Sequence, residues 1–536
     1  MQKNRIKQSL THKCATFRMS FGLAIGLALF STTVSAADVS TIDIGIFKNV
    51  ENSAFQGDVS AQLELGEKYL YGKNVDCNQP VAATWYRKAA EANNAEAQFV
   101  LGQLYAEGIG VTQDLPTAVK WYRKSADQGN VKAQINLGKI YYDGAEIDQN
   151  YAKAYKLFEQ AASQRNSSAQ YQLGLMSEYG EGTTQNNENA LKWYQLAAAQ
   201  GDALAQDSLG VIHQEGKMVP QNDSAAVIWY EKSAKQGYKK AQTNLGHLYE
   251  YAKKPIQDYT LAGKWYLSAA EQGDATAQHN LGNLYRDGKG VEQNFSKAAN
   301  WYQKAIDQGL IESHANLGTL YYQSNPPFQD YKKAVELLSI AAQQGSADAQ
   351  SNLALMYLYG QGVAKNPAKG IEWLRQAVRQ GNARALSNMG SMYMDGIGVK
   401  QDPAKGIEFL QSAAKLGIAE AQYNLGMQYI SGENIQEDYP KAFTLFNQAA
   451  KQGVAEAQVK LGFMYSTGTG VEQNYTKAVD WFETAAQKGD AGAQFALGKM
   501  YEEGTGVAKD KERAEKWFKI FNHTKQNNLM NISKSK

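Results

Sequence analysis

The side chains best suited to bind a metal ion are four histidines in the middle of the chain. His213, His247, His279 and His314 fall in consecutive copies of a sequence repeat, but they lie at positions +3, +1, −3 and −4 from the glycine of each copy's Leu-Gly pair. Neighbouring helices pack about 8–10 Å apart, so histidines that also drift along the helix do not converge on one ion. We therefore expect no metal site.

Glycine pairs and acidic residues do not form a catalytic motif. Gly108-Ile-Gly110 and Gly360-Gln-Gly362 resemble fragments of phosphate-binding loops, but no strand pattern precedes them and no Lys-Ser or Lys-Thr follows. We interpret them as helix C-caps. Acidic residues recur in the repeat as surface residues. The sequence therefore identifies neither a Ser-His-Asp set nor a catalytic pair of carboxylates. We expect no catalytic residues and no cofactor.

One polar column has a regular spacing that a binding surface could use. Asparagine occupies position −2 in six successive copies, and positions −2, +1 and +5 share one face of a helix, away from the buried positions −5, −1 and +3. An amide offers both a donor and an acceptor, which suits the backbone of an extended peptide. The candidate ligand-binding stripe comprises Asn244, His247, Tyr251, Asn280, Asn283, Asp287, Asn316, Asn352, Leu355, Tyr359, Asn388, Asp395 and Asn424. Alternatively, the asparagines bond to a neighbouring helix and stabilise the curvature of the array.

These residues are positioned by a repeat of 36 residues. A Leu-Gly pair or its equivalent occurs thirteen times in unbroken register, from Leu65-Gly66 to Leu497-Gly498, with Ala354 replacing the glycine once. A bulky apolar position at +19 contains all nine tryptophans. Self-similarity at this period indicates stacked supersecondary units rather than separate globular domains.

Each copy is predicted to contain two helices. The first, for example residues 277–285, places apolar or small residues on one face and ends at a glycine corner such as Gly288-Lys-Gly290. Position +12 is always Asp or Asn, which predicts an N-cap for the second helix. We expect the Leu-Gly glycine and a facing alanine column, which includes Ala82, to let the two backbones approach closely. The tryptophans would fill the space between successive units.

The first 36 residues have the pattern of a secretory signal peptide. A basic segment precedes an apolar core at residues 21–30, and the small residues Val34-Ser35-Ala36 follow. This core is too short for a permanent membrane anchor, and no other apolar run approaches the length of a span. We expect an exported chain that is not an integral membrane protein. The periplasm is the favoured location, and the extracellular space is the alternative.

The charge balance argues against a nucleic-acid partner, and the cysteine content argues against internal disulfides. Without the leader, 50 of the 55 basic residues remain against 53 acidic ones, which is unlike the basic footprint of a nucleic-acid-binding protein. Removal of the leader also removes Cys14 and leaves Cys77 alone, so no internal disulfide can form. Stability is therefore expected from packing alone.

The repeated string carries a family resemblance. Ala-Gln-x-x-Leu-Gly-x-x-Tyr-x-x-Gly-x-Gly-Val, followed by Lys-Ala-x-x-Trp-Tyr-x-Lys-Ala-Ala and Gln-Gly, resembles the Sel-one-like repeat (SLR), a relative of the tetratricopeptide repeat. The resemblance implies an all-α fold, a right-handed α/α superhelical solenoid of thirteen 36-residue helix-turn-helix repeats whose first helices line the concave face. The family's usual role is that of an adaptor or scaffold. Its branch with a disulfide in each repeat is not represented here, because the cysteines are missing.

The expected organisation is a signal peptide at 1–36, an N-terminal capping helix at 38–56, thirteen repeats at 57–524 and a polar tail at 525–536. We expect a non-enzymatic scaffold or adaptor of the cell envelope that holds a protein or peptide on its concave face. The alternatives are a peptidoglycan-associated factor that assists cell-wall enzymes and an exported virulence factor that engages a host protein.

Overall fold

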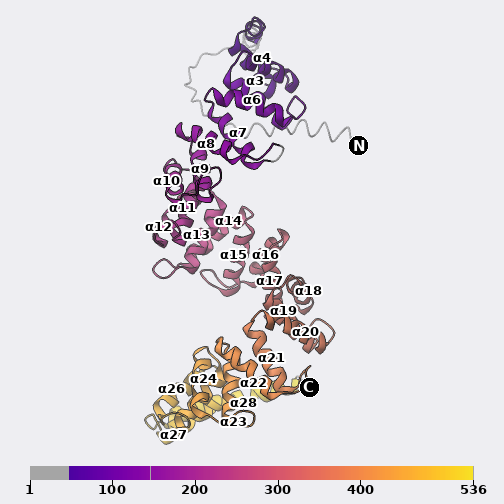
Figure 1. The fold of residues 1–536 in the computed structure, drawn as a ribbon. Helices are drawn as coiled ribbons and strands as arrows, with labels where there is room; N and C mark the ends of the chain where they lie inside the picture. Colours follow the sequence, from indigo (N-terminus) through magenta and orange to yellow (C-terminus); the bar gives the residue numbers. More distant parts are fainter. Residues whose placement is uncertain (1–46, 145–146, 535–536) are drawn as a thin grey trace, which may run out of the picture. The chain divides into compact units, whose positions relative to one another are not determined.

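A computed structural model describes residues 47–144 and 147–534, and within these ranges the chain is built from helices, without strands (Figure 1). The predicted all-α fold of paired helices is confirmed. The predicted signal peptide at 1–36 lies outside the described residues. The chain divides into two compact units, the first ending at Ala269 and the second beginning at Ala270.

Unit 1 begins with a helical segment at residues 47–55. Its further helices are α3 (Val59–Tyr71), α4 (Gln79–Glu91), α5 (Ala95–Glu107), α6 (Leu115–Asp127), α7 (Val131–Asp143), α8 (Tyr151–Ser163), α9 (Ser167–Tyr179), α10 (Asn187–Ala199), α11 (Ala203–Glu215), α12 (Asp223–Lys235) and α13 (Lys239–Tyr251), followed by α14 (Tyr259–Glu271), which contains the unit boundary. Odd-numbered helices are the first helices of the repeats, and even-numbered ones are the second helices.

Unit 2 continues the same alternation. Its helices are α15 (Ala275–Asp287), α16 (Phe295–Asp307), α17 (Ile311–Gln323), α18 (Tyr331–Gln343), α19 (Ala347–Tyr359), α20 (Pro367–Arg379), α21 (Ala383–Asp395), α22 (Pro403–Lys415), α23 (Ala419–Ser431), α24 (Tyr439–Lys451), α25 (Ala455–Thr467), α26 (Tyr475–Gln487), α27 (Ala491–Glu503) and α28 (Lys511–Lys534). Within unit 2, each first helix packs against the second helix that follows it, and some neighbouring first helices also touch.

The predicted caps are confirmed. In all thirteen copies the Asp or Asn at +12 accepts a hydrogen bond from the backbone N–H three residues later. Most first helices end at a left-handed glycine, such as Gly288 with φ 69°. Ala252 and Ser324 are extended instead and still donate their N–H to the last turn. Each cap contributes roughly 1 kcal/mol, so the register is fixed locally in every repeat.

The Leu-Gly glycine lies inside the first helix, against the residue at +20. A Cβ on Gly246 would lie 2.6 Å from Cδ1 of Tyr266, and one on Gly462 would lie 2.5 Å from Cε1 of Phe482. The predicted close approach also occurs, since a Cβ on Gly390 would lie 3.1 Å from the carbonyl oxygen of Gly406 in the facing column. The tryptophans at +19 are half-buried, apart from the buried Trp85. The glycine therefore makes room for the neighbouring column, at +20.

A second column, not foreseen from the sequence, joins neighbouring repeats. The buried Gln98 at −4 donates its Nε2 to the carbonyl oxygen of Ala90 in the preceding repeat, at 3.1 Å. Its Oε1 accepts from Nε2 of Gln128, at 2.7 Å. The same glutamine pair occurs in unit 2, for example between Gln422 and Gln452 at 2.9 Å. These partners stabilise the buried amide, because leaving one of its polar atoms unpaired costs about 1–3 kcal/mol.

The glutamine pair is missing at the C-terminal end of unit 2. Lys488 replaces the outer glutamine and donates to the carbonyl oxygen of Gly453 instead, while Thr524 occupies the last such position. As a result, the buried Oε1 atoms of Gln458 and Gln494 have no hydrogen-bond partner among the described residues.

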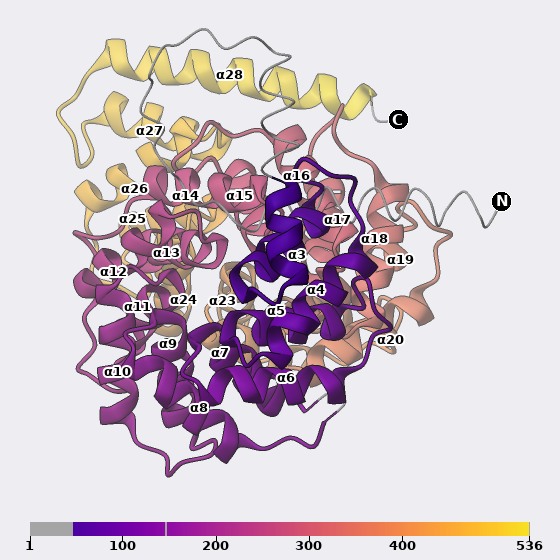
Figure 2. The same ribbon diagram turned by 90° about the horizontal axis from the view of Figure 1, so that it is seen from above.

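The two ends of the array differ in character. Residues 47–55 take the place of a second helix, because Gln62 donates to the carbonyl oxygen of Ala54 at 3.1 Å and the ring of Phe55 packs against Trp85. At the other end α28, the long yellow helix of Figure 2, continues to Lys534 and so includes most of the expected polar tail. No helix of the described part of the chain is long and apolar enough to cross a membrane.

Candidate functional site

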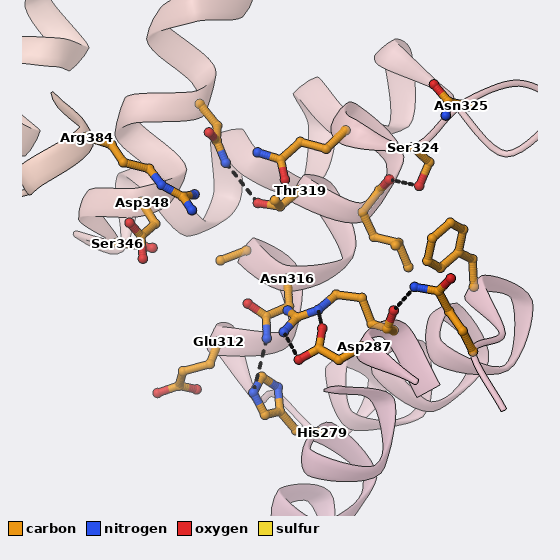
Figure 3. Close-up of a pocket in the computed structure, with 17 residues that line it drawn as sticks. His279, Asp287, Glu312, Asn316, Thr319, Ser324, Asn325, Ser346, Asp348 and Arg384 are labelled. Atoms are coloured by element: carbon orange, nitrogen blue, oxygen red, sulfur yellow. Dashed lines mark hydrogen bonds and ion pairs between the residues drawn. The ribbon is translucent and has the colours of Figure 1, made fainter. Parts of the chain in front are cut away.

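The candidate site is a groove of about 620 Å³ in unit 2. Most of its lining comes from the first helices α15, α17, α19 and α21 of four successive repeats and from the loop that follows α17 (Figure 3). Gln293 of the loop after α15 and Phe295 at the start of α16 complete it. Because first helices present the same face in each copy, residues separated by whole repeats meet in one groove. Its lining is mainly polar, with Phe295 and Leu320 among the few large apolar residues.

A network of neutral groups crosses the boundary between α15 and α17. Nδ2 of Asn316 donates to Oδ1 of Asn283, at 2.8 Å, and lies 3.3 Å from Nε2 of His279. Nδ1 of His279 lies 2.8 Å from Oγ of Ser313. Burial lowers the pKa of His279 and so favours the neutral ring. The tautomer with its proton on Nδ1 satisfies both contacts, because Nδ1–H can then donate to Ser313 while Nε2 accepts from Asn316.

The same contact recurs between the next two first helices. Asn352 is only 7% exposed, and its Nδ2 donates to Oγ1 of Thr319, at 2.9 Å. In unit 1, Nδ2 of Asn244 donates to Oδ1 of Asp207, at 3.0 Å. In these three copies the asparagine at −2 donates a hydrogen bond to the preceding first helix. This is the contact expected if the asparagines bond to a neighbouring helix rather than to a ligand.

Charged groups lie around this neutral network. Nε and Nη2 of Arg286 donate to the carboxylate of Asp287, at 2.6 and 3.2 Å. Burial opposes ionisation of Asp287, but the hydrogen bonds and charges of Arg286 and Lys289 together outweigh it and hold the pKa of Asp287 below its usual value. Arg384 and Asp348 lie at the other end of the groove (Figure 3). The groove therefore offers both signs of charge to a ligand.

The repeat is also recognisable by comparison with known families. A family model, the Sel1 repeat, matches residues 59–94, 95–130, 131–166, 167–202, 203–238, 239–274, 275–310, 311–346, 347–382, 383–418, 419–454, 455–490 and 491–520. The chain belongs to the Sel1 repeat family. Sel1 repeats form scaffolds for protein–protein interaction and are generally non-enzymatic.

Solved structures of Sel1 repeat proteins are similar to this chain. One is c5321, described as a protective antigen present in uropathogenic Escherichia coli strains displaying an SLR fold. It is 30% identical over 90% of this chain and 94% of its own, with a TM-score of 0.55. A Sel1 repeat protein from Oxalobacter formigenes is 36% identical over 58% of this chain and 90% of its own, with a TM-score of 0.45. No curated protein sequence matches the chain.

The Sel1 groove brings together only part of the predicted stripe. Asp287, Asn316 and Asn352 line it, and Asn283 supports it through its bond to Asn316. Three stripe residues belong to unit 1, namely Asn244, His247 and Tyr251. Those of unit 2 that do not line the groove are Asn280, Asn283, Leu355, Tyr359, Asn388, Asp395 and Asn424. Tyr251 and Tyr359 at +5 are 63% and 57% exposed, so they are accessible to a ligand.

The predicted stripe did not include several residues that line the groove of this Sel1 protein. Glu312, Asp348 and Arg384 all occupy position −6. Position −6 lies four residues before −2, one turn earlier on the same helix face, so the helical period could have identified it. Arg286 lies next to the predicted Asp287 and gave no separate signal.

The histidines of the Sel1 repeats do not form a metal centre in the described ranges. No group of three or more His, Cys, Asp or Glu side chains there is placed to hold a metal ion. Cys77 lies in the loop between α3 and α4, with its Sγ 3.4 Å from the carbonyl oxygen of Leu70.

Proposed function

We propose that this Sel1 repeat protein is a cell-envelope scaffold whose groove over α15, α17, α19 and α21 holds an extended peptide segment of a partner protein. The observation that carries the proposal is the groove itself, which presents the same positions, −6 and −2, from successive repeats. A peptide backbone repeats its donors and acceptors along its length, and a row of equivalent positions can match that regularity.

The charges of the groove indicate which segment would fit. Glu312 and Asp348 carry negative charge, whereas Arg384, one repeat further on, carries positive charge. Complementary charge favours specific association, so a matching segment has basic residues over α17 and α19 and an acidic residue over α21. The exposed stripe residues Tyr251 and Tyr359 would extend the contact surface within their own units.

An envelope location is the second part of the proposal. It rests on the leader pattern of residues 1–36, which is typical of exported chains, and we place the protein in the periplasm. The resemblance to c5321, a protective antigen present in uropathogenic strains, favours a second candidate, an exported protein that meets the host. Fractionation of cells into periplasm and medium distinguishes the two.

Site-specific photo-crosslinking in intact cells tests the groove. A benzophenone amino acid replaces Gln323, which lines the groove, or Arg379, an exposed residue of the second helix α20 that does not. We expect a discrete crosslinked polypeptide from position 323 only, weakened by Arg384→Glu and unaffected by the matched Arg379→Glu.

Two outcomes would contradict this proposal. Equal crosslinking from both positions would show that the groove has no special role. A crosslinked product that disappears after digestion with a cell-wall hydrolase, together with binding to purified sacculi, would instead support the peptidoglycan-associated alternative.

A further inference from the structure

In the first repeat, the tryptophan at +19 fills a niche between consecutive second helices. The side chain of Trp85 is 6% exposed and clusters with Ala54 and Leu65. The ring of Phe55 meets it edge-on, with centroids 4.9 Å apart, and Nζ of Lys88 lies 4.3 Å from the indole centroid. An apolar floor and a lysine over the ring are therefore the surroundings that this fold gives to an indole.

The equivalent niche of the eleventh repeat has no tryptophan. Ten repeats after Trp85 stands Leu445, and a hollow of about 490 Å³ lies beside it. Ala414 and Leu425, which line the hollow, correspond to Ala54 and Leu65 of the first repeat. The hollow is thus the tryptophan niche with the indole replaced by a smaller side chain.

The rim of the hollow is open and suited to recognition. Lys415, Gln411 and Gln448 line it and are exposed. Lys415 takes the place that Phe55 has beside Trp85, so its ammonium group can lie against a bound ring. The glutamine amides can accept a hydrogen bond from an indole N–H. The next residue, Leu416, is 58% exposed, which adds apolar surface beside the opening.

The tenth repeat shows that a ring at +19 is accommodated in this part of the array. Phe409 occupies the position there, stacks on Tyr393 with centroids 5.7 Å apart and packs against the local core. An aromatic ring at +19 is therefore compatible with the neighbouring niche. The eleventh repeat has Leu445 at that position, and its Tyr429 lines the hollow from the first helix.

We propose that this hollow binds the indole ring of a tryptophan side chain presented by a partner protein. The ring would insert between α22 and α24 against Ala414, Leu425 and Leu445, with Lys415 at its edge. Tryptophan is one of the residues enriched among the anchors of protein interfaces, because it buries a large area with little loss of rotamer freedom. The site is lined by residues of α22, α23 and α24, apart from the groove of the proposed function, and does not depend on that groove.

Fluorine NMR with 5-fluoroindole as the probe tests the proposal on the full chain. We expect saturable broadening of the probe resonance with the wild-type protein. Leu445→Trp fills the hollow from within and should weaken probe binding by at least about tenfold. The matched control is Leu337→Trp, which adds a tryptophan at the same position of the eighth repeat and should leave probe binding unchanged. If Leu445→Trp loses its helical circular dichroism, Leu445→Phe takes its place.

Three results would overturn the proposal. Absence of saturable broadening with the wild-type chain would show that the hollow does not bind indole. Equal binding by wild-type protein and the folded Leu445 variant would place the probe elsewhere. Equal affinity for 4-fluorophenol would remove the assignment to indole and favour a site for any small ring.

Discussion

Two contacts between neighbouring first helices, one in each unit, have an asparagine at position −2 as the donor but differ in the acceptor. In unit 1, Asn244 donates to the carboxylate of Asp207, whereas in unit 2 Asn316 donates to the neutral amide of Asn283. Burial raises the pKa of Asp207 to about 6, although the bond from Asn244 and the charge of Lys240 oppose the shift. In unit 2, the charges lie around the groove instead. A neutral acceptor therefore joins two helices without the penalty of burying a charge.

Replacement of Asp207 by Asn should have the largest effect. The folded pKa of Asp207 is above its ordinary value of 3.8, so the folded protein retains a proton that the unfolded chain releases between about pH 4 and pH 6. Stability from this group therefore falls as pH rises through that window and is constant above it. We expect Asp207→Asn to raise the free energy of unfolding of unit 1 by about 1–3 kcal/mol near pH 7.5, and by little near pH 4. Urea unfolding at both pH values measures the difference, and an equal gain at both would refute the explanation.

The reverse exchange, Asn283→Asp, should introduce a destabilising buried carboxylate into unit 2. The carboxylate can still accept from Nδ2 of Asn316 and from the hydroxyl of Tyr302, which now lies 2.7 Å from Oδ1 of Asn283. Only its charge is new. We expect a loss of about 1–2 kcal/mol near pH 7.5 that shrinks near pH 4.5. A loss independent of pH would mean that altered packing, not the buried charge, is responsible. Asn283→Ala serves as the control for lost hydrogen bonds.

Removal of the amide itself should have the smallest effect. Asn352 is buried and donates to Thr319, so Asn352→Ala removes one hydrogen bond and should cost about 1 kcal/mol. The half-buried Asn388 stands at the same position two helices later and provides the matched control, with a cost below about 0.5 kcal/mol. Differential scanning calorimetry on both variants checks the difference. Equal losses would mean that the bond to Thr319 contributes nothing measurable.

Much of the architecture could be predicted because the same capping and packing residues recur in each repeat. The caps at +12, such as Asn294, and the glycine corners, such as Gly288, follow from local chemistry and agree with the structure. Which ring faces the Leu-Gly glycine was harder to predict. Positions +19 and +20 are both bulky and apolar, for example Trp265 and Tyr266, and only the rotation of the second helix decides that Tyr266 meets Gly246.

The site could be predicted only in part for a related reason. The stripe at −2, +1 and +5 identified Asp287, Asn316 and Asn352, because these follow from the period of one helix. The groove also depends on the loop after α17, where Ser324 and Pro326 stand at the two glycine positions and Ser324 and Asn325 line the groove. Loop paths are not fixed by helical periodicity. Whether the stripe asparagines touch a ligand stays a prediction.

The glutamine pair has a consequence for how such a chain can change in length. Gln98 reaches back to Ala90 of the repeat before it and forward to Gln128 of its own repeat, and the same two bonds recur 36 residues later, where Gln134 reaches Ala126 and meets Gln164. Duplication or loss of one whole repeat of this kind therefore places an equivalent glutamine beside an equivalent alanine, and both bonds of the junction are restored. The eighth and tenth repeats, which have His314 and Leu386 at this position, lack the pair. A duplication that ended partway through a repeat would break the junction at its edge. Inherited length variants of this protein should therefore differ by whole repeats.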